Sequence, residues 1–256
     1  MLDKGPYLEA TPPYAPGKPL RGLIAEGVVA QGFAALTSDE LPLDRPLYVH
    51  QVQAIRKVAA GRNVVVATGT GSGKTESFLI PILDSLVRER ERGTLGPGVR
   101  ALLLFPMFAL AIDQMKRLRC LLANYPEISF GRYTGETETD PRKAKEAFAE
   151  LNIDEPLLPN EILSRQEMQK RPPHLLLTNY AMLEYLLLRP LDMELFATGA
   201  ESKWRFIVVD EAHVYDGSQG AEIAMLLRRV RDRVAPDRAI QCIATSATVG
   251  GDSDPT

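Results

Sequence analysis

The chain has 256 residues, 45% of them apolar and 25% charged, a composition typical of a soluble globular protein with one or two domains. Its 30 basic and 33 acidic residues give a net charge of −3, so no overall positive charge draws the protein to nucleic acid or membranes. Two cysteines, Cys120 and Cys242, exclude a disulfide scaffold, and no apolar run is long enough to cross a bilayer. The N-terminus lacks the apolar core of a secretory signal, so we expect a cytoplasmic protein without membrane contact.

Residues 1–40 differ from the rest of the chain and are predicted to form an N-terminal extension. Five prolines between residues 6 and 19 oppose regular structure, and residues 22–36 show one modest helical pattern. This extension either packs on the main domain or forms a flexible linker, and the composition favours neither alternative.

From residue 41 to residue 256, apolar runs alternate with helical patterns. We expect strands at 63–67, 100–105, 130–133, 174–178, 206–210 and 240–245, and helices at 51–60, 74–92, 110–123, 182–188 and 221–234. Strands that are apolar on both sides indicate an α/β domain with a parallel sheet and helices on both faces. A segment from about residue 139 to residue 173 interrupts this alternation and is predicted to be a surface insertion. It contains a charged helix predicted over 141–151.

A glycine-rich segment follows the first strand of this domain and leads into a helix. Glycines allow a tight turn in which several N–H groups point at one anion, and the helix start adds its positive dipole end. A lysine there reaches the outer phosphates of a nucleotide, and a following hydroxyl is a Mg²⁺ ligand. The alternative is a plain glycine-rich turn, which the strand–loop–helix context disfavours. The predicted phosphate-binding residues are Thr68, Gly69, Thr70, Gly71, Ser72, Gly73, Lys74 and Thr75, with Thr68 where the strict pattern begins with glycine.

An acidic pair, Asp210 and Glu211, follows the strand at 206–210. The carboxyl ends of strands in α/β sheets border the ligand crevice, where a nucleotide hydrolase needs a second Mg²⁺-holding group. Asp210 suits that role, and Glu211 is placed to orient or deprotonate an attacking water. An isolated acidic pair is more often a helix cap or a solvated turn, but the upstream phosphate-binding loop reverses that preference.

Together these motifs resemble those of superfamily 2 DEAD/DEAH-box helicases. Lys74 with Thr75 resembles motif I, Asp210-Glu211-Ala212-His213 resembles motif II, and Ser246-Ala247-Thr248 resembles motif III. Residues 47–51 resemble the adenine-reading Q-type motif with Gln51 as the reader, 106–111 resemble motif Ia, 134–136 the glycine motif, and 178–184 motif Ib. The surrounding sequence is most similar to the YprA-like branch of bacterial DNA helicases.

The resemblance implies a RecA-like lobe that binds ATP and Mg²⁺. It makes Lys74, Asp210, Glu211 and His213 catalytic, with Thr75 and Asp210 at the metal. It makes Ser246 and Thr248 couplers of nucleotide and nucleic acid. By the same resemblance, DNA is favoured over RNA as the partner, and the nucleic-acid backbone is held by Pro106, Thr134, Gly135, Thr178 and Asn179. Hydroxyls and free N–H groups can make such contacts without a large positive charge.

Two positions depart from the family pattern, since Phe108 and Ile112 stand where polar asparagine is expected. This apolar pair could pack inward, stack on a base or belong to a repurposed surface, and inward packing is favoured. The arginines at 228, 229, 231 and 233 are expected to form a solvated helix face in preference to a DNA contact. His50, His174 and both cysteines are expected to be structural, with Cys242 inside the last strand and Cys120 packed on a helix.

Motors of this superfamily use two RecA-like lobes, and the second supplies an arginine finger worth about 10³–10⁵ in rate. Eight residues follow Thr248 in this chain, so we expect a first lobe that binds nucleotide but has weak or no activity alone. A second lobe would have to join it in cis or in trans. The alternative from another class is a non-catalytic nucleic-acid-binding or adaptor module with a vestigial phosphate-binding loop. A nucleotide hydrolase of a different family is a third possibility, but it leaves the segments at 178–179 and 246–248 unexplained.

Overall fold

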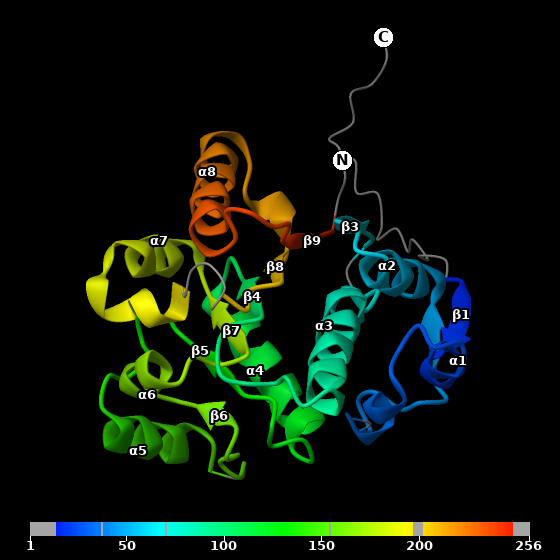
Figure 1. Ribbon diagram of the computed structural model, residues 1–256, viewed down its shortest axis with the longest axis horizontal. Coiled ribbons are helices and arrows are strands. Elements are labelled where there is room, and N and C mark those ends of the chain that lie inside the picture. The colour runs from blue at the N-terminus through cyan, green and yellow to red at the C-terminus, as the bar shows by residue number, and fades with distance from the viewer. Residues whose placement is uncertain (1–13, 37, 70, 154, 197–201, 248–256) are drawn as a thin grey trace, which may run out of the picture.

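The computed structural model describes residues 14–36, 38–69, 71–153, 155–196 and 202–247. Its centre is a seven-stranded parallel sheet with the order β3-β9-β8-β4-β7-β5-β6, which runs from one side of the molecule to the other (Figure 1). The strands are β3 (Val64–Ala67), β4 (Ala101–Leu104), β5 (Phe130–Arg132), β6 (Glu161–Ile162), β7 (Leu175–Thr178), β8 (Phe206–Val209) and β9 (Gln241–Ser246). The predicted parallel α/β fold is therefore confirmed, and six of these strands lie where the apolar runs placed them.

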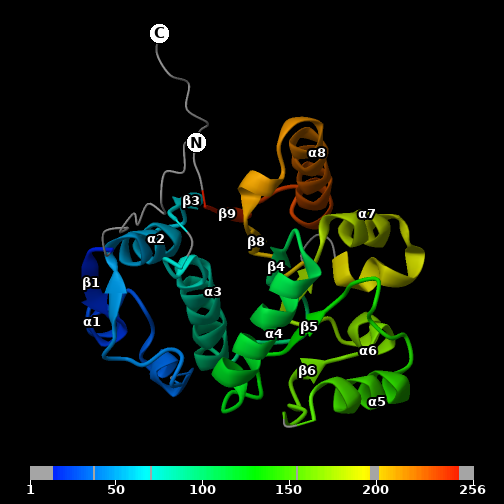
Figure 2. The same cartoon turned by 180° about the vertical axis from the view of Figure 1, so that it is seen from behind.

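Helices cover both faces of the sheet. One face carries α2 (Val49–Ala59), α3 (Lys74–Glu91) and α4 (Phe108–Leu122), and the other carries α6 (Arg165–Lys170), α7 (Tyr180–Leu188) and α8 (Gly217–Val234) (Figures 1 and 2). Successive residues of β4 show this division, because Leu103 packs with the first group and Leu102 with the second. Burial on both sides explains why the central strands are continuous apolar runs.

The described part of the N-terminal extension packs against the sheet domain. β1 (Pro16–Pro19) pairs antiparallel with β2 (Pro46–Tyr48), and α1 (Leu20–Ala25) and a 3₁₀ helix, η1 (Gln31–Leu36), follow β1. Leu20, Leu23 and Phe33 are fully buried in the same core as α2 and α3. The described residues of this segment are therefore part of the packed molecule.

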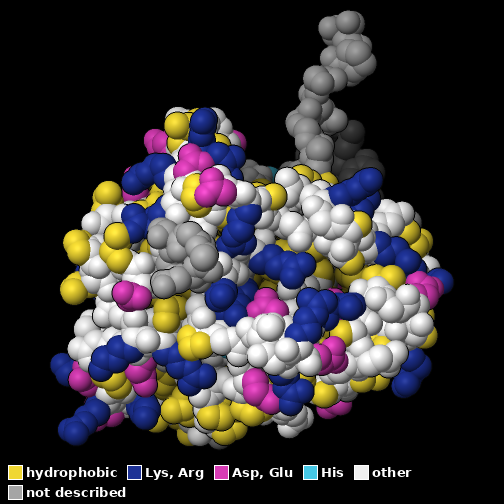
Figure 3. Space-filling view, viewed as in Figure 1, with side chains coloured by type: hydrophobic (Ala, Val, Ile, Leu, Met, Phe, Trp, Pro, Cys, Tyr) yellow, Lys and Arg dark blue, Asp and Glu magenta, His cyan; other side chains and the backbone are white. Residues whose placement is uncertain are grey.

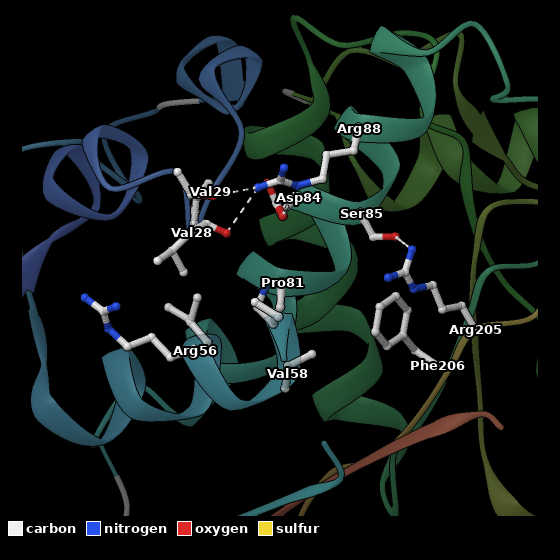
Figure 4. A pocket seen from close by; sticks show the side chains of 13 residues that line it. Val28, Val29, Arg56, Val58, Pro81, Asp84, Ser85, Arg88, Arg205 and Phe206 are labelled. Carbon is white, nitrogen blue, oxygen red and sulfur yellow. Dashed lines mark hydrogen bonds and ion pairs between the residues drawn. The ribbon is translucent and has the colours of Figure 1, made fainter. Parts of the chain in front are cut away.

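Polar contacts join this segment to α3. The Asp84 carboxylate accepts the Ala30 N–H at 2.6 Å, and the Arg88 guanidinium donates to the carbonyl oxygens of Gly27 and Val28 (Figure 4). These side chains border a cavity of about 420 Å³ whose other walls come from α2 and from the start of β8. The cavity touches the amino end of β8, whereas the predicted acidic pair follows its carboxyl end.

The segment at 139–173 does more than form a surface insertion. The predicted helix is present as α5 (Pro141–Leu151), capped by the Asp140 carboxylate. β6 then extends the sheet by pairing with β5, and α6 buries Met168 completely. This segment therefore supplies the last strand of the sheet, which the sequence analysis did not predict.

The predictions for the two cysteines were wrong, since both side chains are exposed. Cys242 lies on β9 as predicted, but it points to the same sheet face as Val65, which is 70% exposed at the edge strand β3. Packing on this face involves β4, β7 and β8 and does not extend to β3. Cys120 lies on the solvent side of α4.

The surface shows no dominant charge on the face drawn in Figure 3, where Lys and Arg side chains are interspersed with Asp and Glu. Across the described residues, none of the helices combines the length and the apolar character that a membrane crossing needs.

Candidate nucleotide-binding site

The glycine-rich loop connects β3 to α3 at the carboxyl edge of the sheet. Gly71 and Gly73 have φ values of 75° and 66°, a left-handed conformation that favours glycine. A Cβ on Gly73 would also lie 2.4 Å from the Gln51 side-chain nitrogen, so a larger residue would displace the Gln51 amide. Thr68 and Ser72 close the loop through a hydroxyl contact of 2.6 Å. The backbone thus turns tightly at the N-terminus of α3, as a phosphate-binding loop must, while Thr70 lies outside the described residues.

Lys74 places its ammonium group at the centre of this loop. The side chain is 8% exposed, and Nζ donates to the carbonyl oxygens of Thr68 and Gly69 at 3.1 and 3.3 Å. Nζ also lies 3.8 Å from Glu211 Oε1. The fold therefore brings the loop and the acidic pair, which are more than 130 residues apart in sequence, into direct electrostatic contact.

The acidic pair is held by the neighbouring strand β9. The Thr245 hydroxyl donates a short hydrogen bond to Asp210 Oδ1 and accepts the Glu211 N–H at 3.0 Å. Asp210 is 7% exposed, and burial raises the pKa of its carboxyl above the ordinary value. Glu211 has a positive φ of 48°, the one non-glycine case in the described chain. Such strain persists where surrounding contacts hold it, as the Thr245 bond does here.

His213 connects the acidic segment to the end of β9. Its Nδ1 accepts the Ala247 N–H at 3.3 Å and lies 3.3 Å from Glu211 Oε2. The Ser246 carbonyl oxygen accepts the Thr68 N–H at 3.1 Å, so this end of β9 also contacts the phosphate-binding loop. Three of the predicted motifs therefore meet at one point, and Thr248 lies outside the described residues.

Gln51 lies beside the loop, but its amide is engaged within the chain. Oε1 accepts the Tyr48 N–H and Nε2 donates to the Gly73 carbonyl oxygen, each at 2.7 Å. The side chain is 4% exposed, so it ties α2 to the loop, and its predicted role as adenine reader stays a prediction.

Several residues at this site were not predicted from the sequence. His50 Nε2 lies 2.9 Å from the Ser72 carbonyl oxygen, and the His50 ring stacks on Tyr48 at 5.7 Å between centroids. Tyr14 joins these rings, and its hydroxyl lies 2.8 Å from where a Cβ on Gly69 would stand. Tyr48 and His50 offered a weak aromatic signal at the start of α2, whereas Tyr14 and Thr245 gave none.

The donor set next to Lys74 fits Mg²⁺, which binds proteins through few carboxylates and keeps phosphate and water ligands. Thr75 carries a half-buried hydroxyl at the start of α3, 3.5 Å from Gln114 Nε2. Asp210 accepts the Thr245 hydroxyl through Oδ1 and presents its carboxylate beside the loop. The described residues contain no cluster of three His, Cys, Asp or Glu side chains that could hold a metal by themselves.

The residues predicted to line the nucleic-acid track lie at the carboxyl ends of β4, β5 and β7. Thr134 and Thr178 are buried, and the Thr178 hydroxyl donates to the Tyr133 carbonyl oxygen at 2.6 Å. Asn179 caps α7 by accepting the Met182 N–H at 2.9 Å. Of the two remaining positions, Pro106 is half-buried and Gly135 is exposed. The loops thus share one edge of the sheet, and their contact with nucleic acid stays a prediction.

This fold and loop geometry define the class of α/β domains that bind a nucleoside triphosphate at the carboxyl edge of a parallel sheet. The family model for DEAD/DEAH box helicases matches residues 48–254, and the chain belongs to that family. It is an ATP-dependent helicase domain, as the sequence motifs indicated.

Named relatives agree with this assignment. Druantia protein DruE of Escherichia coli is 33% identical over 99% of this chain and 18% of its own length. The ATP-dependent helicase YprA of Bacillus subtilis is 29% identical over 72% of this chain and 20% of its own. The crystal structure of the DUF1998 helicase MrfA bound to DNA and AMPPNP superposes with a TM-score of 0.69 and 27% identity, covering 96% of this chain and 29% of that one. The chain thus spans less than a third of each relative.

Proposed function

We propose that this chain is the ATP-binding lobe of a DNA helicase or translocase and that Lys74, Asp210, Glu211 and His213 carry its nucleotide chemistry. The observation that supports this most directly is the 3.8 Å contact between Lys74 Nζ and Glu211 Oε1, which unites the two motifs at the edge of the sheet. We also propose a cytoplasmic location, because both cysteines are free and thiols stay reduced in that compartment.

In the proposed mechanism, the loop N–H groups and the dipole of α3 bind the phosphates of ATP. Lys74 exchanges its bonds to the Thr68 and Gly69 carbonyl oxygens for phosphate oxygens. Thr75 and Asp210 would hold Mg²⁺, which supplies charge neutralisation on the phosphates. Glu211 then orients the attacking water and accepts its proton. His213, bonded to Ala247, would link this event to motif III.

The nucleic-acid backbone would lie across the loops that contain Pro106, Thr134, Gly135, Thr178 and Asn179. Since two of these side chains are buried, we expect their loops to contact phosphates mainly through backbone N–H groups. DNA is favoured over RNA because the MrfA structure, which matches 96% of this chain, contains DNA. Such contacts are compatible with the net charge of −3.

We further propose that a second RecA-like lobe, in cis or in trans, completes the site. The arginines that contact α3 beside the loop, Arg45 and Arg117, both pair with Glu76 at 3.2 and 2.6 Å. Neither is free to stabilise charge on a transferring phosphate. An arginine finger from a second lobe would raise the rate about 10³–10⁵-fold, so the 256-residue chain alone should hydrolyse ATP slowly.

Titration with a fluorescent ATP analogue tests the nucleotide site. The wild-type chain should bind it in the presence of Mg²⁺, and Lys74→Ala should abolish binding because the only buried ammonium in the described loop is removed. Lys145→Ala, on the exposed side of α5, is the matched control and should bind normally. Absence of binding at millimolar nucleotide would contradict the proposal and favour the non-catalytic adaptor.

Activity measurements test the need for a second lobe. We expect at most trace ATP hydrolysis and no strand separation by the purified chain, with or without single-stranded DNA. Robust DNA-stimulated turnover by a monomer would show that no second lobe is required. Competition between DNA and RNA oligonucleotides of one sequence would decide the preferred strand.

A further inference from the structure

A second cavity lies between α4 and α5, next to the proposed nucleic-acid track. Its volume is about 380 Å³, within the range of small-molecule sites. Apolar side chains from both helices line it: Phe108, Ile112, Met115, Ala147, Phe148 and Leu151. The two positions that depart from the family pattern, Phe108 and Ile112, are therefore half-buried at this cavity and are not part of the closed core.

Arginines stack on both aromatic rings of the cavity. The Arg132 guanidinium lies 4.3 Å from the Phe108 ring centre, and the Arg119 guanidinium lies 4.8 Å from that of Phe148. Arg119 is ion-paired with Glu155 and Glu161 at 2.6 and 2.8 Å. Together these groups give the cavity flat surfaces of the kind on which planar heterocycles stack.

Arg132 differs from Arg119 because no carboxylate of the described chain lies within ion-pair distance of it. Its Nη1 is buried and has no hydrogen-bond partner among the described residues. Burial lowers the pKa of this guanidinium more than the charges of Glu136 and Glu161 raise it. A buried donor without a partner costs stability unless a ligand supplies the acceptor.

The charges around the cavity favour a neutral ligand over an anion. The cationic side chains Lys116, Arg119 and Arg132 are matched in number by the acidic Glu136, Glu138 and Glu161. An anion would gain from Arg132 but would meet the exposed carboxylates of Glu136 and Glu138. A planar neutral group with hydrogen-bond acceptors would accept a hydrogen bond from Nη1 and pack on the aromatic rings of the cavity. It would not be repelled by the carboxylates.

The cavity is directly connected to the proposed track. Phe108 follows Pro106 by two residues, and the Thr137 hydroxyl accepts the Thr134 N–H and donates to the Arg132 carbonyl oxygen. We propose that this cavity takes one unstacked base of a DNA strand that lies on the track, with the base against Phe108 and an acceptor atom on Arg132. This inference rests on the proposed nucleic-acid binding.

Single-stranded DNA with one abasic site, moved stepwise along the strand, tests the inference. Each oligonucleotide is titrated at low salt, where backbone contacts are strongest. Loss of the accommodated base should weaken binding by roughly five- to a hundredfold at one position relative to an intact strand. Abasic sites elsewhere should have a smaller effect.

Two tryptophan variants on α5 identify the cavity as the place where the base binds. Ala147 lines the cavity, so Ala147→Trp should fill it and remove the positional effect. Ala149 is exposed on the same helix, so Ala149→Trp is the matched control and should retain it. Arg132→Met removes the unpaired donor without adding bulk and should reduce the positional effect. It tests the cavity independently in case Ala147→Trp does not fold.

Equal affinity of the wild-type chain for all abasic strands would overturn the base pocket and leave the proposed function intact. A positional effect that persists in both Ala147→Trp and Arg132→Met would also overturn it, since the base would then lie elsewhere. If the wild-type chain bound no strand at all, the proposed nucleic-acid function would fail and the base pocket with it.

Discussion

We expect protonation of His174 to destabilise the fold as the pH falls below neutrality. The side chain is buried between strands, where Nδ1 accepts the Ser129 N–H at 2.8 Å and Nε2 lies 3.0 Å from the Gly96 carbonyl oxygen. One accepting and one donating nitrogen define the neutral ring. Burial, followed by the positive charge of Arg100, lowers the pKa of His174 from 6.5 to about 4.

The sign follows from proton binding in the two states. Between pH 6.5 and 4 the unfolded chain holds a proton on His174 that the folded chain excludes, so stability falls as the pH falls. The stability that the neutral, buried ring contributes is fully present above pH 7. The two pKa values correspond to about 3 kcal/mol of unfolding free energy, of which about 2 kcal/mol is lost by pH 5.

Urea unfolding at pH 7.5, 6 and 5 measures this loss. His174→Gln keeps an amide donor and acceptor but cannot titrate, so its stability should fall about 2 kcal/mol less than that of the wild type over this interval. Parallel loss of stability in wild type and His174→Gln would refute the neutral, buried histidine.

Three further predictions concern packing and accessibility. Gly131→Ala should cost about 1–3 kcal/mol by urea unfolding, because its Cβ would lie 2.8 Å from a carbonyl oxygen of β6; Gly135→Ala, with open space around it, should cost far less. Asn160→Ala should cost about 2–3 kcal/mol in the same assay, since the two N–H groups of its buried amide are shared among three carbonyl oxygens, of Leu122 at the end of α4 and of Tyr125 and Ile128 after it. Cys120 and Cys242 should both react with maleimide in the native state, faster as the pH rises from 7 to 9 because the thiolate is the reacting form; protection of either thiol would contradict the exposed placement.

The central strands were predictable because their burial on both faces makes them apolar runs in the sequence. The two outer additions to the fold were not. β6 has only two residues, and one of them, Glu161, is charged, which argues against a buried strand in the sequence. In the fold, Arg119 pairs with this carboxylate at 2.8 Å and makes its burial possible. β1 contains Pro16 and Pro19, which argue against a strand unless it pairs at an edge, as it does with β2.

Sequence spacing predicted where the site motifs lie but not the contacts around them. Lys74 and Asp210 could be predicted as site residues because a glycine-rich loop and a carboxylate that both follow buried strands are, in combination, typical of a nucleotide site. Thr245 could not be, since a threonine at the end of a strand resembles any β-branched residue. The pairing of β9 with β8 places its hydroxyl against Asp210. Likewise Cys242 was mistaken for a core residue because strand periodicity does not reveal where the covering helices end.

The contacts around β9 give the proposed coupling a physical route. Thr245 holds the strained backbone of Glu211, and His213 holds the Ala247 N–H. With the bond from the Thr245 hydroxyl to Asp210, three hydrogen bonds connect the acidic segment to the same end of β9, whose Ser246 carbonyl oxygen in turn accepts a bond from the phosphate-binding loop. A phosphate that draws Lys74 away from Glu211 would change the forces on that segment, and the strand end could not stay unaffected. Such a shift needs no long chain of residues, because the loop contacts Ser246 and the acidic segment contacts its two neighbours, Thr245 and Ala247.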